Sequence, residues 1–142
     1  MPKDVSERSG GCLCGAVRYV ATGEPRWAAH CHCTSCRRSS GNAMSTYAGY
    51  LREQVLYLED RPASYASSPG VSRSFCQTCG TPIAYEGERW PDEIHLFLCT
   101  LDDPESIRPQ SHVHVSEQVA WIELADGLPQ HAASSDDDPP ES

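Results

Sequence analysis

Seven of the eight cysteines lie in three short clusters, a spacing that is typical of metal ligands. The clusters occupy residues 12–14 (Cys-Leu-Cys), 31–36 (Cys-His-Cys-Thr-Ser-Cys) and 76–79 (Cys-Gln-Thr-Cys). The first residues contain no apolar stretch of the kind that directs secretion, so we expect a cytoplasmic protein. Because a reducing compartment keeps thiols free or bound to metal, metal binding is favoured over disulfides.

Two of the clusters have the form of a structural zinc site, which usually takes four ligands as two short pairs from distant parts of a chain. Cys76 and Cys79 are followed by Gly80, and glycine tolerates the left-handed conformation that ends such a turn. Cys12 and Cys14 lie among glycines that permit a tight bend. Pairing the two elements predicts a site of four thiolates, which joins the N-terminal region to the middle of the chain. The alternative is four free thiols.

The remaining trio, Cys31, Cys33 and Cys36, leaves one position of a tetrahedral zinc ion without an assigned ligand. His30 and His32 are the nearest candidates in the sequence. In an extended segment both would point away from the cysteines, because side chains alternate along a strand, so neither is favoured. These residues alone do not decide whether another side chain of the protein completes the site.

The charge of the chain argues against two classes of partner. The formal net charge is −9, which repels phosphate backbones, and no basic stripe counteracts it. No apolar run approaches the roughly 18 residues that a membrane span requires. We therefore expect neither a nucleic-acid partner nor a membrane partner.

The elements that must position the cysteines are short strands rich in β-branched and aromatic residues, separated by Gly, Pro, Asp and Ser. No segment shows a sustained helical period. Residues 102–110 could hold one helical turn, with Asp103 as the N-cap and Pro104 as the first helical residue. The sequence predicts a mainly β, antiparallel domain. The expected strand regions are residues 16–22, 54–60, 82–88, 93–102, 111–117 and 120–124.

The two ends of the chain read differently from its middle. Residues 130–142 are acidic and have no core-forming residue after Ala133, which predicts a disordered tail. Residues 1–9 are expected to be a flexible N-terminus. One domain of residues 10–129 remains, a length that allows a single core.

Three segments in this order resemble the glutathione-dependent formaldehyde-activating enzyme family: "GGCLCGAVRY" (10–19), "CHCTSCRRSSG" (31–41) and "FCQTCGTPI" (75–83). The resemblance extends over roughly residues 10–129. It implies antiparallel hairpins around zinc, a fold that is shared with small zinc-bearing chaperone-like proteins. It also implies two zinc ions per chain, the first structural and the second catalytic, with water or substrate as the fourth ligand of the second. The implied ligands are Cys12, Cys14, Cys76 and Cys79 for the first ion, and Cys31, Cys33 and Cys36 for the second.

The resemblance implies a carbon–sulfur lyase type of chemistry, in which glutathione and formaldehyde combine to S-(hydroxymethyl)glutathione. A zinc ion with three thiolate ligands suits this role, because a coordinated thiol loses its proton. Arg37 and Arg38 follow the trio directly, and either could pair with a substrate carboxylate or simply be solvated. Two other functions stay open, a non-enzymatic zinc-stabilised interaction module and a redox or metal-handling dithiol protein.

Several residues outside the clusters have weaker signals. His112 and His114 are expected to share one strand face, either as acid–base groups of the site or as half-exposed strand residues. Cys99 is expected to be a small buried hydrophobe. Aromatic residues such as Tyr85, Trp90 and Trp121 are expected to pack in the core or at the rim of the site.

Overall fold

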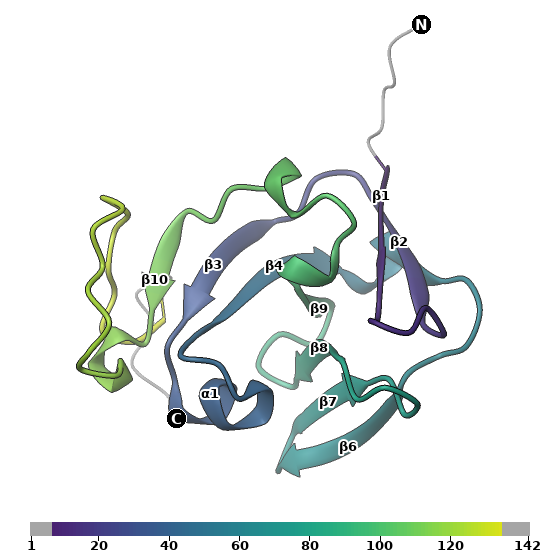
Figure 1. The fold of residues 1–142 in the computed structure, drawn as a ribbon, viewed down its shortest axis with the longest axis horizontal. Helices are drawn as coiled ribbons and strands as arrows, with labels where there is room; N and C mark the ends of the chain where they lie inside the picture. Colours follow the sequence, from purple (N-terminus) through teal and green to yellow (C-terminus); the bar gives the residue numbers. More distant parts are fainter. Residues whose placement is uncertain (1–6, 135–142) are drawn as a thin grey trace, which may run out of the picture.

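The computed structural model describes residues 7–134, which form two β-sheets and a short α-helix (Figure 1). The smaller sheet has the strand order β1–β2–β5, with β1 at Glu7–Gly11, β2 at Arg18–Thr22 and β5 at Val55–Tyr57. The larger sheet has the order β10–β3–β4–β9–β8–β7–β6. Its strands are β3 (Trp27–Cys31), β4 (Ser45–Leu51), β6 (Ala63–Ser68), β7 (Val71–Phe75), β8 (Pro82–Gly87), β9 (Glu93–Phe97) and β10 (Ser111–Val113). The predicted mainly β class is confirmed.

The strand pairs of both sheets are antiparallel, with one exception among the described residues. β10 runs parallel to β3, so that His112 lies opposite His30 and Val113 lies opposite Cys31. This register matters for the site, because residues that are paired across two strands point to the same side of the sheet.

The core lies between the strands β2, β4, β8 and β9. Its largest fully buried members include Tyr19, Tyr50, Ile83 and Leu96. The same cluster contains Cys12 and Cys76, and a second, smaller cluster is formed by Cys31, Cys36 and Tyr47. Cysteines from two of the three sequence clusters therefore take part in the main apolar core.

Helix α1 (Thr34–Ser40) was not expected from the sequence, because seven residues are too few to show a helical period. Its ends are nevertheless well specified. The Cys33 side chain is the N-cap and accepts a hydrogen bond from the backbone N–H of Cys36. Gly41 closes the helix in the left-handed conformation, with φ at 75°. The cap thus holds two cysteines on one turn.

The segments after β9 agree with the sequence at one position and differ at another. The predicted helical turn is confirmed as a 3₁₀ turn over Pro104–Ser106, where the Asp103 side chain accepts a hydrogen bond from the backbone N–H of Glu105. The predicted strand at 120–124 is wrong, since these residues form turn and irregular structure. Trp121 in this segment is 75% exposed, so its apolar surface does not serve a sheet.

The described structure extends beyond residues 10–129 at both ends. β1 begins at Glu7, and the segment after Leu128 lies along β10. There the backbone N–H of His112 donates to the carbonyl of Pro129, and the N–H of His131 donates to the carbonyl of His112. The remainder of the expected flexible terminus and acidic tail lies outside the described residues. Independent folding of residues 10–129 stays a prediction.

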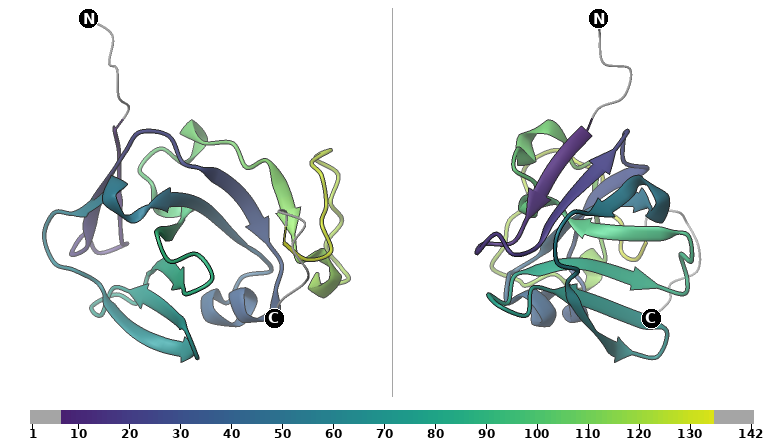
Figure 2. Two further views of the ribbon diagram at one scale, coloured as in Figure 1. Left: turned by 180° about the vertical axis from the view of Figure 1, so that it is seen from behind. Right: turned by 90° about the vertical axis from the view of Figure 1, so that its right-hand side faces the viewer.

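All three views of the ribbon place α1 and the β6–β7 hairpin at the same end of the molecule (Figures 1 and 2). The β1–β2 hairpin and β10 lie at opposite sides of the large sheet in Figure 1. Within residues 7–134, no helix has the length and apolar character needed to cross a bilayer.

Candidate functional site

The first group of sulfurs has the geometry of a closed tetrahedral site. The Sγ atoms of Cys12, Cys14, Cys76 and Cys79 all lie within 4.8 Å of one another. The Sγ atom of Cys14 is 3.7 Å from that of Cys12 and 3.8 Å from that of Cys76. Zinc–sulfur bonds of about 2.3 Å in a tetrahedron place neighbouring sulfurs about 3.8 Å apart, so these residues fit a zinc ion.

Two tight turns build this group. The backbone N–H of Gly15 donates to the carbonyl of Cys12, and the N–H of Gly80 donates to the carbonyl of Cys76. Both glycines are left-handed, with φ at 86° and 83°. A residue with a Cβ atom would be strained there, which explains why each pair of cysteines is followed by glycine.

Hydrogen bonds to sulfur favour the thiolate form at two members of this group, Cys12 and Cys79. The backbone N–H of Val17 donates to the Cys12 sulfur at 3.2 Å. Hydrogen bonds from the hydroxyl and the backbone of Thr81 lower the pKa of Cys79 to about 5. A thiolate is the form that binds metal, so these hydrogen bonds favour the metal-binding form at Cys12 and Cys79. At Cys14, despite a hydrogen bond from the backbone of Ala16, burial and the neighbouring sulfurs raise the pKa to about 11.

The second group of sulfurs has three members. Cys31 ends β3, Cys33 caps α1 and Cys36 lies in its first turn, and their Sγ atoms lie within 4.8 Å of one another. The trio therefore depends on one strand end and one helix start, which are only two residues apart. This local construction explains how the sequence spacing alone could predict the cluster.

The three sulfurs cannot all carry negative charge unless a cation joins them. Hydrogen bonding with Cys33 and Cys36 raises the pKa of Cys31, whereas hydrogen bonds from Cys31 and Cys33 lower the pKa of Cys36. Negative charge on one of these close sulfurs therefore disfavours negative charge on the other two. A divalent ion would replace the protons, so the donor set fits zinc with three protein ligands.

The two neighbouring histidines lie on the other side of the strand. The rings of His30 and His32 both contact His112, the first by stacking at 4.7 Å between centroids and the second by a hydrogen bond of 2.9 Å. Within residues 7–134, no other His, Cys, Asp or Glu donor lies close enough to all three sulfurs to complete the trio. Among the described residues, the trio is therefore a set of three donors of these types.

The expected pairing of His112 with His114 on one strand face is wrong. β10 ends at Val113, and His114 has a left-handed backbone with φ at 57°, which interrupts the alternation of a strand. His112 faces away from the cysteines and forms a hydrogen bond of 2.8 Å with Asp126. The chain His32–His112–Asp126 therefore holds the loop of the trio from behind rather than reaching the sulfurs.

A wall of residues from four strands faces the trio; Tyr85 was expected in the core or at the rim of the site, whereas sequence reasoning missed Tyr47, Arg73 and Phe97. The Tyr47 hydroxyl lies 3.3 Å from the Cys36 sulfur, and the Arg73 guanidinium donates to this hydroxyl at 3.5 Å. The guanidinium lies 5.0 Å above the ring of Tyr85, and Phe97 packs on Tyr47 with centroids 4.8 Å apart. These side chains come from β4, β7, β8 and β9, so no local spacing could have revealed the wall.

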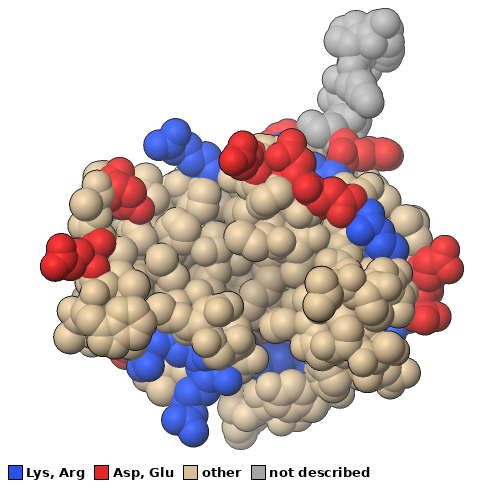
Figure 3. Space-filling view, viewed as in Figure 1, with Lys and Arg blue, Asp and Glu red and all other residues tan. Residues whose placement is uncertain are grey.

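The two predicted substrate-binding arginines lie on α1 beside the trio. Arg37 is half-buried and donates from Nη2 to the Thr34 hydroxyl at 3.1 Å, while its buried Nε has no partner among the described residues. Arg38 is exposed. Basic side chains gather on the surface where α1 lies, whereas acidic ones line the opposite, upper edge of the same face (Figure 3).

The prediction that Cys99 is buried is wrong. Cys99 is exposed, because the 3₁₀ turn at Leu98–Thr100 directs Leu98 into the core instead. It takes no part in either group of sulfurs.

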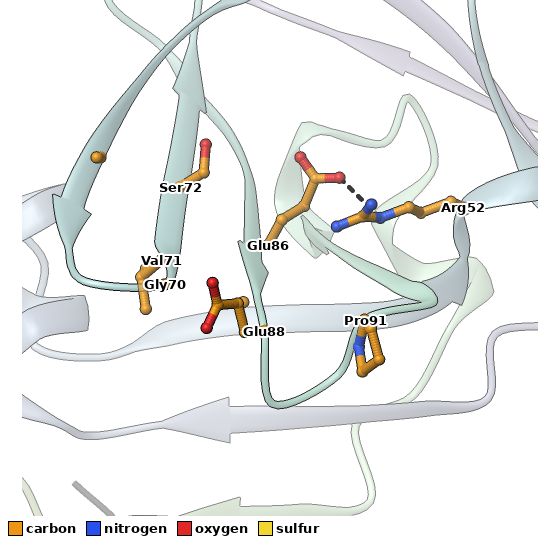
Figure 4. A pocket seen from close by; sticks show the side chains of 9 residues that line it. Arg52, Gly70, Val71, Ser72, Glu86, Glu88 and Pro91 are labelled. Carbon is orange, nitrogen blue, oxygen red and sulfur yellow. Dashed lines mark ion pairs between the residues drawn. The ribbon is translucent and has the colours of Figure 1, made fainter.

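A shallow depression elsewhere on the surface carries no comparable chemistry (Figure 4). It lies along β7 and β8 and contains no cysteine among its lining residues. Its arginine, Arg52, already forms an ion pair of 3.1 Å with Glu86. The cysteine groups, and not this depression, are the candidate site.

Comparisons with known proteins show the family and the fold of this chain. The family described as "Glutathione-dependent formaldehyde-activating enzyme" matches residues 7–117. A Halomonas elongata protein that provisionally bears the same name is 29% identical over 126 residues, which cover 81% of this chain and 79% of the relative. The crystal structure of a Rhodobacter sphaeroides protein shares the fold, with a TM-score of 0.54 and 18% identity over 87% of this chain and 98% of that one. Since the family match spans all seven clustered cysteines, the chain belongs to the glutathione-dependent formaldehyde-activating enzyme family.

Proposed function

We propose that this chain is a cytoplasmic enzyme with two zinc ions, which makes or breaks a carbon–sulfur bond in the adduct of a small thiol and an aldehyde. The observation that carries the proposal is the unequal division of seven sulfurs. Four lie within 4.8 Å of one another, as the ligands of a tetrahedral zinc site do, and three have no fourth His, Cys, Asp or Glu donor beside them among residues 7–134. A closed set is typical of structural zinc and an open one of catalytic zinc.

The family name and that of the Halomonas elongata relative support glutathione as the thiol and formaldehyde as the aldehyde. Glutathione carries two carboxylates, and an arginine guanidinium can hold a carboxylate with two parallel hydrogen bonds. Arg37 and Arg38 are the proposed carboxylate-binding residues, because both lie on α1 beside the trio.

In the proposed reaction the thiolate sulfur attacks the aldehyde carbon and a carbon–sulfur bond forms. The electron pair of the carbonyl moves to its oxygen, which takes up a proton to give the hydroxymethyl thioether. Cys31, Cys33 and Cys36 would hold the ion, which supplies acidification of the thiol and polarisation of the carbonyl. The Tyr47 hydroxyl holds the Cys36 sulfur in place, and α1 brings the arginines near the same point.

The first test compares the wild-type protein with Cys33→Ser in a mixture of glutathione and formaldehyde. Exchange NMR measures how fast the adduct forms and dissociates. We expect the wild type to accelerate the exchange and Cys33→Ser to lose this effect while keeping its melting temperature, because the quartet is intact.

Metal analysis provides the control. The triple variant Cys31→Ser/Cys33→Ser/Cys36→Ser should contain one zinc ion instead of two and remain folded. A wild type that binds two ions but does not accelerate the exchange would refute the enzymatic function and support a zinc-stabilised interaction module.

A further inference from the structure

Arg73 is a buried cation without a carboxylate partner. Arg73 is only 7% exposed. Within residues 7–134, no Asp or Glu lies within ion-pair distance of its guanidinium. Buried charges in proteins are normally paired, because taking an ion out of water costs several kcal/mol. The partner of this guanidinium must therefore be sought in the site that it faces.

The contacts of Arg73 direct it toward the trio. Its Nε donates to the Ser67 hydroxyl at 3.2 Å, and its Nη1 donates to Tyr47, whose hydroxyl touches the Cys36 sulfur. The ring of Tyr85 supports the guanidinium from one side at 5.0 Å. These contacts fix the cation beside the sulfurs, on the side from which β7 and β8 approach.

The position of the Arg73 guanidinium affects the net charge of the site. Three thiolates and one divalent ion carry one net negative charge, which the guanidinium neutralises. A fourth thiolate would add another negative charge in a buried place, where repulsion is strong. A neutral ligand such as water or imidazole would add none. The cation thus raises the affinity of the site for a thiolate ligand much more than its affinity for a neutral ligand.

We propose that Arg73, held by Tyr47 and Tyr85, is a specificity-determining residue that lets the trio accept the anionic sulfur of a small thiol as its fourth ligand. This inference rests on the proposed function and deepens it, since it assigns the selection of thiolate over neutral ligands to one side chain. It predicts a preference for thiols that does not require a carboxylate on the ligand.

The test uses the full chain with cobalt(II) in place of zinc, because thiolate ligands give cobalt charge-transfer absorption. The wild type and Arg73→Gln are titrated with 2-mercaptoethanol, which has no carboxylate, and with imidazole as a neutral ligand. We expect Arg73→Gln to bind the thiol roughly 10- to 100-fold more weakly, the range for a lost charge-assisted interaction. Imidazole affinity should stay within about threefold, because a neutral ligand adds no charge.

Arg73→Lys keeps the charge and should retain most of the thiol affinity, while Arg52→Gln removes an arginine that is paired with Glu86 and serves as the matched control. Equal thiol-to-imidazole affinity ratios in the wild type and Arg73→Gln would overturn the inference and leave the proposed function intact. A wild type that binds no thiol at all would refute the proposed function itself.

If Arg73→Gln fails to hold two metal ions, Tyr47→Phe decides the question. It keeps the cation and the ring but removes the hydroxyl between the guanidinium and Cys36. We expect its thiol-to-imidazole ratio to fall at least about threefold, as for one lost hydrogen bond. An unchanged ratio would overturn the inference as stated, in which Tyr47 holds the guanidinium beside Cys36.

Discussion

The seven clustered cysteines have the same thiol group but different surroundings. Cys12 and Cys76 are embedded in the main core, and Cys79 is hydrogen-bonded by Thr81. Cys36 instead touches a tyrosine hydroxyl in a separate small cluster. What divides them chemically is the number of donors that converge, because an ion with four thiolates is saturated and an ion with three is not.

Single side chains behind the trio also matter, although they do not touch the sulfurs. His112 connects the loop residue His32 to Asp126 through two hydrogen bonds. We expect His112→Leu to weaken zinc binding at the trio by about 10-fold, at the low end for residues that orient metal ligands. Competition with a chromophoric chelator measures the two sites in turn.

His114→Gln is the matched control for this variant, since its histidine follows β10 and lies outside the chain of hydrogen bonds. The quartet should release its ion unchanged in both variants. A trio affinity in His112→Leu equal to the wild type would show that the hydrogen-bonded chain does not position the ligands.

At the scale of secondary structure, the sequence predicted some strands and missed others. β2, β8 and β9 lie within expected strand regions, whereas β4 (STYAGYL) and β6 (ASYASS) are composed largely of small residues and were not expected. Pairing with neighbours, not intrinsic propensity, makes them strands. The wall around the trio was unpredictable for the same reason, because it requires the order of β4, β9, β8 and β7.

The turns that carry the quartet allow a direct test of backbone strain. Gly80 has φ at 83°, and a Cβ atom at this position would have no heavy atom within 4 Å. Any effect of Gly80→Ala is thus conformational, and we expect it to lower the free energy of unfolding by about 1–2 kcal/mol. Denaturant unfolding measures the change.

Gly80→Asn provides the internal control, because asparagine tolerates the left-handed region better than alanine. It should lose less stability than Gly80→Ala. Equal stability of all three proteins would mean that the turn relaxes out of the left-handed conformation at little cost.

For the whole molecule, the quartet connects distant parts of the fold. Cys12 and Cys14 follow β1 of the small sheet, while Cys76 and Cys79 connect β7 and β8 of the large one. A zinc ion held by both pairs would join the two sheets beside the main core. Binding of the expected ion would then contribute directly to the free energy of folding.

Loss of the quartet should consequently unfold the protein. Structural zinc contributes roughly 10–16 kcal/mol of apparent binding energy, which is as large as the total stability of a typical domain. We expect Cys76→Ser to be largely unfolded at room temperature by circular dichroism. Cys99→Ser changes an exposed cysteine outside both groups and should stay within about 0.5 kcal/mol of the wild type.

A folded Cys76→Ser protein with a cooperative transition near that of the wild type would show that packing alone holds the sheets together. In that case the quartet would need another explanation than structural zinc.

The segment that lies along β10 is outside the region that matches the family, although it contacts the loop behind the trio. The family match ends at residue 117. Asp126 and the backbone of residues 129–133 form hydrogen bonds with β10 and the turn after it. His112 of β10 is in turn hydrogen-bonded to His32, in the loop of the trio. A protein shortened to the matched region would keep every cysteine and still lose the brace behind three of them.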